Sequence, residues 1–255
     1  MQLFSKKPVF FRYYIISLKH NTMKRGIILT VFMAAMTITT GFAGIQSAEK
    51  ETRDLKGFTK VSFGVSGNIY ISTGAEFKVV LEGDKSVLED IITEVSGGRL
   101  TVKKENWRFN NNEKVTVYIT MPEINGLGVS GSGRAEIKDA VKVDDLSLSV
   151  SGSGKIYTNE IAVNNLKSSI SGSSDIIVGS GDAAKGNISI SGSGNYMGEN
   201  TKIGTLDISI SGSGDCATNV TESLKASVSG SGNVTYAGNP KIDARVSGSG
   251  KIRSR

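Results

Sequence analysis

The residues that most often carry out catalysis are scarce in this sequence. Its only histidine, His20, precedes residue 44, so residues 44–255 lack the side chain used most for acid–base catalysis and for zinc or iron ligation. Its only cysteine, Cys216, can form no disulfide within the chain. Cys216 occupies an alternating position that equivalent segments fill with residues such as Val234, and cysteine is among the most buried residue types. We therefore expect a buried, structural cysteine.

Acidic residues are too dispersed to act together. Glycan cleavage by carboxylates requires acidic side chains that converge on one site. Asp144-Asp145 is the only adjacent acidic pair after residue 125, and adjacent residues of a strand point to opposite faces. The sequence thus predicts no catalytic residue, no cofactor and no enzyme activity.

Metal ligation is the remaining chemistry that polar residues here could support. Asp175, Asn195, Asp215 and Asn233 recur at equivalent positions, and aligned oxygens of this kind can bind Ca²⁺. Calcium-binding β-roll repeats, however, have a shorter period and a denser Gly/Asp pattern. We therefore expect solvated polar residues and no metal site.

The sole tryptophan lies in a polar, Asn-rich segment, residues 105–112. Exposed aromatic and arginine side chains are enriched where proteins bind partners. We favour the simpler interpretation that this segment packs over one end of the core. If it instead contacts a ligand, the contact residues are Trp107, Arg108 and Phe109.

All of these residues must be positioned by a repeat that fills the second half of the chain. Ser-Gly-Ser-Gly, or once Ser-Gly-Ser-Ser, recurs at intervals of 18 to 21 residues and starts at Ser130, Ser151, Ser171, Ser191, Ser211, Ser229 and Ser247. Apolar residues alternate with polar ones before each tetrapeptide. The position directly before it reads Val129, Val150, Ile170, Ile190, Ile210, Val228 and Val246.

Alternation with a period of two indicates half-buried strands. A unit of about 20 residues cannot bury its apolar face alone, but stacked copies share one continuous core. The sequence therefore predicts an all-β fold, a parallel β-helix or solenoid over residues 126–255, with the right-handed form being the usual one. An antiparallel β-prism is the alternative.

Residues 55–125 lack the tetrapeptide and predict N-terminal coils with a capping β region. Alternating runs occur at 58–63, 68–72, 77–81, 100–103 and 115–120. Between them, residues 84–95 predict a short helix that Asp84 would cap.

The first 43 residues look like a leader. Residues 23–43 have the charged start, apolar run and small residues of a signal peptide, and residues 1–22 then form an upstream extension that is not translated or is removed. The apolar run is shorter than the ~20 residues a membrane span needs. Residues 44–54 predict a polar, mobile lead-in.

Charge argues against a nucleic-acid partner. Six of the 30 basic residues and no acidic residue lie in residues 1–43, so the rest of the chain carries 24 basic and 24 acidic residues. A nucleic-acid-binding protein is expected to carry a net basic patch.

The sequence resembles a known family, the exported bacterial proteins called putative autotransporter adhesin, head GIN domain (DUF2807). Residues 58–61, 65–71, 97–102 and 115–122 and the Ser-Gly-Ser-Gly series carry the resemblance, which covers most of residues 57–250. It implies a parallel β-helical protein in the envelope of Gram-negative bacteria of the Bacteroides kind. It implies no shared catalytic or ligand-binding residues.

These observations favour an exported, non-catalytic cell-envelope module, adhesin-like, that presents a repetitive polar β-surface to a glycan or an envelope protein. A structural or stress-related periplasmic interaction protein is the alternative, and a carbohydrate-active β-helix enzyme is disfavoured by the missing histidine. We expect the periplasm, the outer-membrane surface or the extracellular space as the location, with no membrane span after signal cleavage. An oligomer is compatible with this surface.

Overall fold

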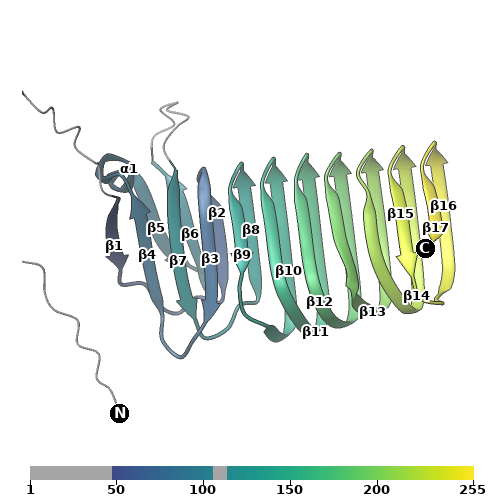
Figure 1. Cartoon of the computed structure of the whole chain (residues 1–255), viewed down its shortest axis with the longest axis horizontal. Coiled ribbons are helices and arrows are strands. Elements are labelled where there is room, and N and C mark those ends of the chain that lie inside the picture. The colour runs from purple at the N-terminus through teal and green to yellow at the C-terminus, as the bar shows by residue number, and fades with distance from the viewer. Residues whose placement is uncertain (1–47, 106–113) are drawn as a thin grey trace, which may run out of the picture. The chain divides into compact units, whose positions relative to one another are not determined.

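The computed structural model describes residues 48–105 and 114–255, which belong to one compact unit. Within them, the repeat region forms a stack of parallel coils (Figure 1). Its strands are β8 (Gly126–Gly131), β9 (Arg134–Ile137), β10 (Val141–Gly152), β11 (Lys155–Gly172), β12 (Asp175–Gly192), β13 (Asn195–Gly212), β14 (Cys216–Gly230), β15 (Asn233–Ala237), β16 (Lys241–Gly248) and β17 (Lys251–Ser254).

Each coil lies on the preceding one in register. Ile170 of β11 pairs with Val150 of β10 and with Ile190 of β12, and all strand pairs between β8 and β17 are parallel. The parallel register confirms the β-solenoid and excludes the antiparallel prism.

A complete coil has three straight sides. In β11 these sides are residues 155–158, 160–163 and 165–172. The pairing with β12 is interrupted between one side and the next, which marks the corners. The first side follows the Ser-Gly-Ser-Gly corner, and the third side leads into the next corner. Coils approach so closely at the corner that a Cβ at Gly212, whose φ is +125°, would overlap the carbonyl oxygen of Gly192.

The core consists of the predicted apolar columns. Val150, Ile170, Ile190 and Ile210 are each at most 2% exposed. Val246, at the same position of the last coil, is 44% exposed. Stacked identical positions thus bury one another, which is the expected source of stability for such a repeat.

The N-terminal region extends the stack and then changes its strand direction. Its elements are β1 (Glu49–Arg53), β2 (Lys60–Gly64), β3 (Gly67–Thr73), β4 (Lys78–Gly83), α1 (Lys85–Glu89), β5 (Ile91–Ser96), β6 (Arg99–Lys104) and β7 (Val115–Met121). β2 and β3 join the repeat region by parallel pairing with β8 and β9, and β6 and β7 pair in parallel with β2 and β3. β4 and then β1 continue beyond β7 in antiparallel fashion, and β5 continues beyond β6 in the same way.

Two sequence-based expectations fail in this region. The helix is only Lys85–Glu89, and the Asp84 side chain makes no capping hydrogen bond. The next residues form β5, where β-branched Ile91 and Ile92 fit a strand that pairs with β6. Residues 49–53, expected in a mobile lead-in, form β1 because pairing with β4 supplies backbone hydrogen bonds.

The two ends of the stack differ. At the N-terminal end, α1 buries Val87 and Leu88 against the core. At the C-terminal end, all eight residues of β16 are exposed. No helix in residues 48–105 and 114–255 is long and apolar enough to cross a membrane.

Candidate functional site

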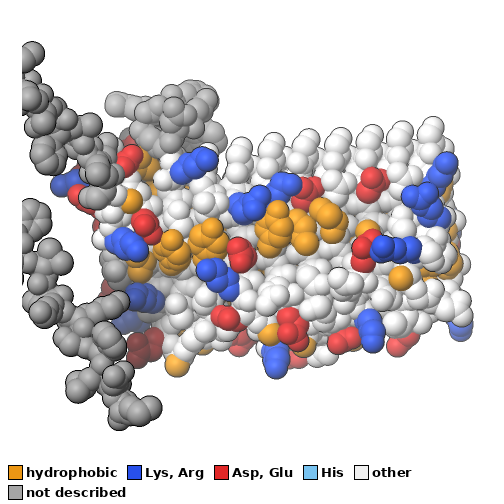
Figure 2. Space-filling view, in the orientation of Figure 1, with side chains coloured by type: hydrophobic (Ala, Val, Ile, Leu, Met, Phe, Trp, Pro, Cys, Tyr) orange, Lys and Arg blue, Asp and Glu red, His pale blue; other side chains and the backbone are white. Residues whose placement is uncertain are grey.

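The outer surface of the first side carries a row of aromatic and apolar residues. Tyr70 of β3 lies between buried Ile69 and Ile71, so it points outward, as strand alternation requires. Register pairing aligns equivalent outward positions along the stack, in the order Tyr118, Tyr70, Glu136, Tyr157, Ile177 and Met197. We call these six residues the aromatic row. Figure 2 shows orange side chains along the middle of the stack, with blue and red ones among them, on a mainly white surface.

Cations lie beside the tyrosine rings. The rings of Tyr70 and Tyr118 stack with centroids 5.6 Å apart and planes 23° apart. The Lys138 ammonium lies 4.5 Å from the Tyr70 centroid, and the Lys50 ammonium lies 6.0 Å from that of Tyr118. Cation–π contacts of this kind fix long side chains against the rings.

The same arrangement recurs farther along the row. The Arg134 guanidinium carbon lies 5.0 Å from the Tyr157 centroid. Tyr118 and Met197 are each 39% exposed. The row therefore presents ring edges, a thioether and the Glu136 carboxylate to solvent, with cations beside it and the ring faces partly covered by neighbouring groups.

The Tyr118 hydroxyl is a hydrogen-bond donor at neutral pH. Partial desolvation, followed by a hydrogen bond with the Glu82 carboxylate and its charge, raises the pKa of Tyr118 above its usual value. A protonated phenol and cation-flanked rings can bind a partner, but they provide no activated nucleophile.

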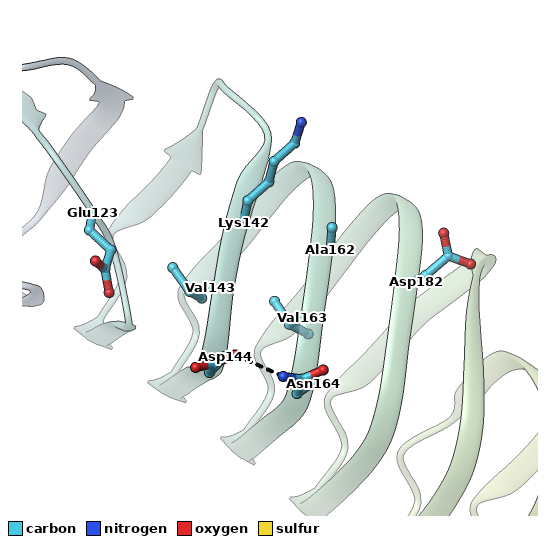
Figure 3. Close-up of a pocket in the computed structure, with 8 residues that line it drawn as sticks. All are labelled: Glu123, Lys142, Val143, Asp144, Ala162, Val163, Asn164 and Asp182. Carbon is cyan, nitrogen blue, oxygen red and sulfur yellow. Dashed lines mark hydrogen bonds between the residues drawn. The ribbon is translucent and has the colours of Figure 1, made fainter.

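Three acidic residues line one groove of the described surface, but they lie apart from one another in it. A shallow groove of about 620 Å³ on the second side is lined by Glu123, Lys142, Val143, Asp144, Ala162, Val163, Asn164 and Asp182 (Figure 3). There, the Asp144 carboxylate accepts a 2.7 Å hydrogen bond from the Asn164 amide, and Lys142 and Asp182 extend away from that pair.

The adjacent acidic pair is also split between two surfaces. Asp145 lines a different groove from Asp144 and accepts a 2.9 Å hydrogen bond from the Asn165 amide. Each carboxylate thus accepts a hydrogen bond from an amide of the next coil. Both side chains are exposed, because Asp144 lies where the pairing of β10 with β11 is interrupted, so the pair is separated by a corner and not by the two faces of one strand.

The aspartate and asparagine column is solvated, as the sequence suggested, at Asp215 but not at Asp175. Asp175 is buried, and its carboxylate accepts hydrogen bonds of 2.6 Å from the Lys155 ammonium and 2.9 Å from the Asn195 amide. Asp215 in turn accepts 2.9 Å hydrogen bonds from the backbone and side-chain amides of Asn233. In residues 48–105 and 114–255 no group of three or more potential ligand residues is arranged to hold a metal ion.

The cysteine and tryptophan predictions have different outcomes. Cys216 is 1% exposed, and burial raises the pKa of its thiol, so the prediction of a buried structural cysteine is confirmed. Trp107, Arg108 and Phe109 lie outside the described residues.

Sequence analysis missed the aromatic row, although part of it was visible. Tyr157, Ile177 and Met197 each follow the first serine of a tetrapeptide by six residues, at a position where alternation calls for polar residues. Tyr70 and Tyr118 could not be added, because their strands are far apart in sequence and no repeat aligns them.

The described residues thus form a β-solenoid with a row of aromatic and apolar side chains along the outer surface of one side. Residues 57–240 match the family described as "Putative auto-transporter adhesin, head GIN domain", and the chain belongs to that family. This confirms the resemblance found in the sequence.

Solved structures with the same architecture come from Bacteroides and Parabacteroides species. A putative adhesin from Bacteroides fragilis NCTC 9343 is 25% identical, with a TM-score of 0.77, and the match covers 82% of this chain and 98% of that one. A putative adhesin from Parabacteroides merdae is 21% identical, with a TM-score of 0.67 and coverage of 83% and 98%. A protein from Parabacteroides distasonis called a putative lipid binding protein is 22% identical, with a TM-score of 0.68 and the same coverage. No curated protein matches the chain.

Proposed function

We propose that this chain is an exported, non-catalytic, adhesin-like binding module of the cell envelope, with the aromatic row as its contact surface. The observation that carries the proposal is the composition of that row on a surface otherwise rich in serine, threonine and asparagine. Tyrosine, methionine and arginine are enriched in the cores of protein interfaces, whereas serine is depleted there.

The geometry favours a protein partner over a glycan. Sugars stack on open aromatic faces, but here a neighbouring ring or a cation lies against the faces of Tyr70, Tyr118 and Tyr157. Ring edges, the Met197 thioether and the Arg134 guanidinium remain available, and these groups suit apolar and carboxylate side chains of a protein.

Export is supported by the signal-like residues 23–43 and by the autotransporter adhesin description of the family. Fractionation of cells that express the full chain, with protease added to intact cells, tests this part. Release of a shortened chain into the periplasm or its digestion at the surface is expected. Full-length protein in the cytoplasm would contradict export.

Binding of the purified protein to intact cells and to envelope fractions tests the contact surface. Replacing Tyr157, Ile177 and Met197 together with serine should weaken saturable binding at least tenfold and leave the circular dichroism spectrum unchanged, because all three side chains point outward. Thr235→Ala is the matched control, since Thr235 lies at the same outward position beyond the row.

The arms of this experiment separate the alternatives. Binding that survives periodate treatment of the target but not protease treatment supports a protein partner. Binding that is lost after periodate treatment would show that the partner is a glycan and not a protein. Equal binding by the triple variant would remove the row from the proposal, and no binding to any target would contradict an adhesin-like role.

A further inference from the structure

The strongest feature outside the aromatic row is the open C-terminal face of the stack. Ile242 and Val246 of β16 continue buried columns, but they are 48% and 44% exposed. One edge of β16 pairs with β14, and no strand of the described residues pairs with the other edge. A free edge flanked by exposed core residues is a template for another strand.

From the sequence of β16 we infer that this edge binds a second copy of the chain, with the two β16 strands antiparallel and the two-fold axis at Ala244. In that register Ile242 lies opposite Val246 of the second copy, so apolar side chains meet within the joined cores. Asp243 lies opposite Arg245 of the second copy, so two cross-strand ion pairs form on the outer surface. Ala244 lies opposite Ala244 of the second copy.

Moving the two-fold axis by one residue along β16, in either direction, gives a less complementary register that still keeps apolar residues inward. A shift of the two-fold axis to Asp243 sets Asp243 opposite its own copy, and a shift to Arg245 sets Arg245 opposite its own copy. Like charges directly opposite destabilise a strand pair, whereas opposite charges stabilise it. Within one chain, the Arg245 Nε atom is already 3.9 Å from an Asp243 carboxylate oxygen on the same outward surface.

The helical rise of the coil fits the same symmetry. Residues 238–240 come one side before β16, and a Cβ at Gly238 would overlap the Val220 carbonyl oxygen, so this segment lies directly on the preceding coil. β17 comes one side after β16, and it lies on β15, which places it farther toward the C-terminal end of the stack. A two-fold axis through Ala244 exchanges the two ends of β16. The projecting strand β17 of one copy therefore faces the recessed segment 238–240 of the second copy.

This arrangement also separates the basic residues of the two β17 strands. Lys251 and Arg253 of one copy lie over segment 238–240 of the other and away from their own equivalents. An isologous contact of this type closes on itself, so the expected product is a dimer and not a filament.

Sedimentation velocity over a range of protein concentrations tests the inference. The protein is expressed from the full chain and purified with whatever processing the cell has carried out. A monomer–dimer equilibrium is expected. Arg245→Asp sets acidic residues opposite each other at both ion pairs and should weaken the dimer at least about tenfold. Asp243→Arg combined with Arg245→Asp should restore it to within about threefold, and Lys167→Asp on β11 should have no effect.

Cysteine cross-linking tests the register independently of affinity. Ala244→Cys should give a disulfide-linked dimer on oxidation, because directly opposite residues of antiparallel strands are within disulfide distance. Lys241→Cys is the matched control, since Lys241 lies opposite Ser247 of the second copy and far from its own equivalent. A monomer at all concentrations, a ladder of larger species, or equal cross-linking through Lys241→Cys would overturn the inference.

Discussion

The repeat region, residues 126–255, and the N-terminal region, residues 48–125, solve the same packing problem in different ways. In the repeat region each coil covers the one before it with equivalent residues in parallel register. In the N-terminal region, antiparallel β1, β4 and β5 and the helix α1 close the stack with residues that have no equivalents elsewhere. Parallel coils can be added one after another without limit, whereas the antiparallel strands and the helix end the stack.

The difference explains why the two ends have different chemistry. Val87 and Leu88 of α1 are buried at the closed end, and Ile242 and Val246 are exposed at the open end. At the closed end the helix covers apolar residues, although β1 and β5 each pair with only one strand of the described residues. The open end retains the hydrogen-bonding edge of every interior coil, and this edge is what makes pairing with a second copy available.

Substitution of glycines should give the largest difference in the free energy of unfolding between the two regions. Gly212→Ala is expected to destabilise the protein by roughly 3–5 kcal/mol, because the new Cβ overlaps the Gly192 carbonyl oxygen and φ at this residue is +125°. Gly57→Ala in the N-terminal region should cost only about 1–2 kcal/mol, since φ is +74° but no atom lies within 4 Å. Urea unfolding measures both.

Equal costs at the two glycines would break this comparison, because they would assign the effect to backbone conformation alone. Ser213→Ala, next to Gly212 and exposed, serves as the control and should change the free energy of unfolding by less than about 0.5 kcal/mol.

Truncation of apolar residues at the two ends should give the next largest effect. Leu88→Ala removes a side chain that is 3% exposed and should cost about 2–4 kcal/mol. Ile242→Ala removes one that is 48% exposed, and it should cost about 1 kcal/mol or less at concentrations where the monomer predominates. Thermal and urea unfolding at low protein concentration compare the two, and a larger loss for Ile242→Ala would contradict an open end.

The fold of the repeat region could be predicted because one physical rule applies to every coil. The columns that contain Val150 and Ile156 are apolar in sequence, and they are buried in every coil except the last one, where Val246 and Ile252 lie. In the N-terminal region no repeat supports the assignment, so Ile91, Ile92 and Val95 fitted a helical pattern as well as a strand. Pairing with β6, a contact made by distant residues, decides for the strand.

The contact surface was less predictable than the core. Alternation reveals which residues point outward, but it does not reveal which outward residues lie side by side. Tyr70 and Tyr118 are 48 positions apart in the chain, and they stack only because β7 is placed on β3. The cations come from elsewhere again, since Lys50 lies on β1 and Lys138 directly follows β9.

A polar residue inside the apolar columns should give a smaller effect of the opposite sign. Ser168 is fully buried at a position that is Leu148 and Ile188 in the flanking coils, and the described residues offer its hydroxyl no hydrogen-bond partner. Ser168→Ala should therefore stabilise the protein by about 1 kcal/mol. Ser169→Ala, on the outer surface, is the control, and a loss of stability for Ser168→Ala in urea unfolding would show that the hydroxyl is satisfied.

The smallest effect is expected from the charged pair that joins β11 and β12. Burial by itself would raise the pKa of the Asp175 carboxyl, but hydrogen bonds from Lys155 and Asn195 outweigh it and hold that pKa below its usual value. The hydrogen bond to Asp175 and its charge raise the pKa of the Lys155 ammonium. Since the Lys155 side chain is 43% exposed, the pair should contribute less than about 1 kcal/mol.

The sign of each shift sets the pH range of this contribution. A carboxyl with a lowered pKa stabilises the fold above about pH 4, and this is lost as pH falls through the lowered pKa. An ammonium with a raised pKa stabilises the fold below about pH 10, and this is lost as pH rises through the raised pKa. A double-mutant cycle with Lys155→Met and Asp175→Asn should thus give a coupling energy that is constant from about pH 5 to 9 and declines toward both extremes. A coupling that changes sharply near pH 7 would assign the interaction between these coils to other groups.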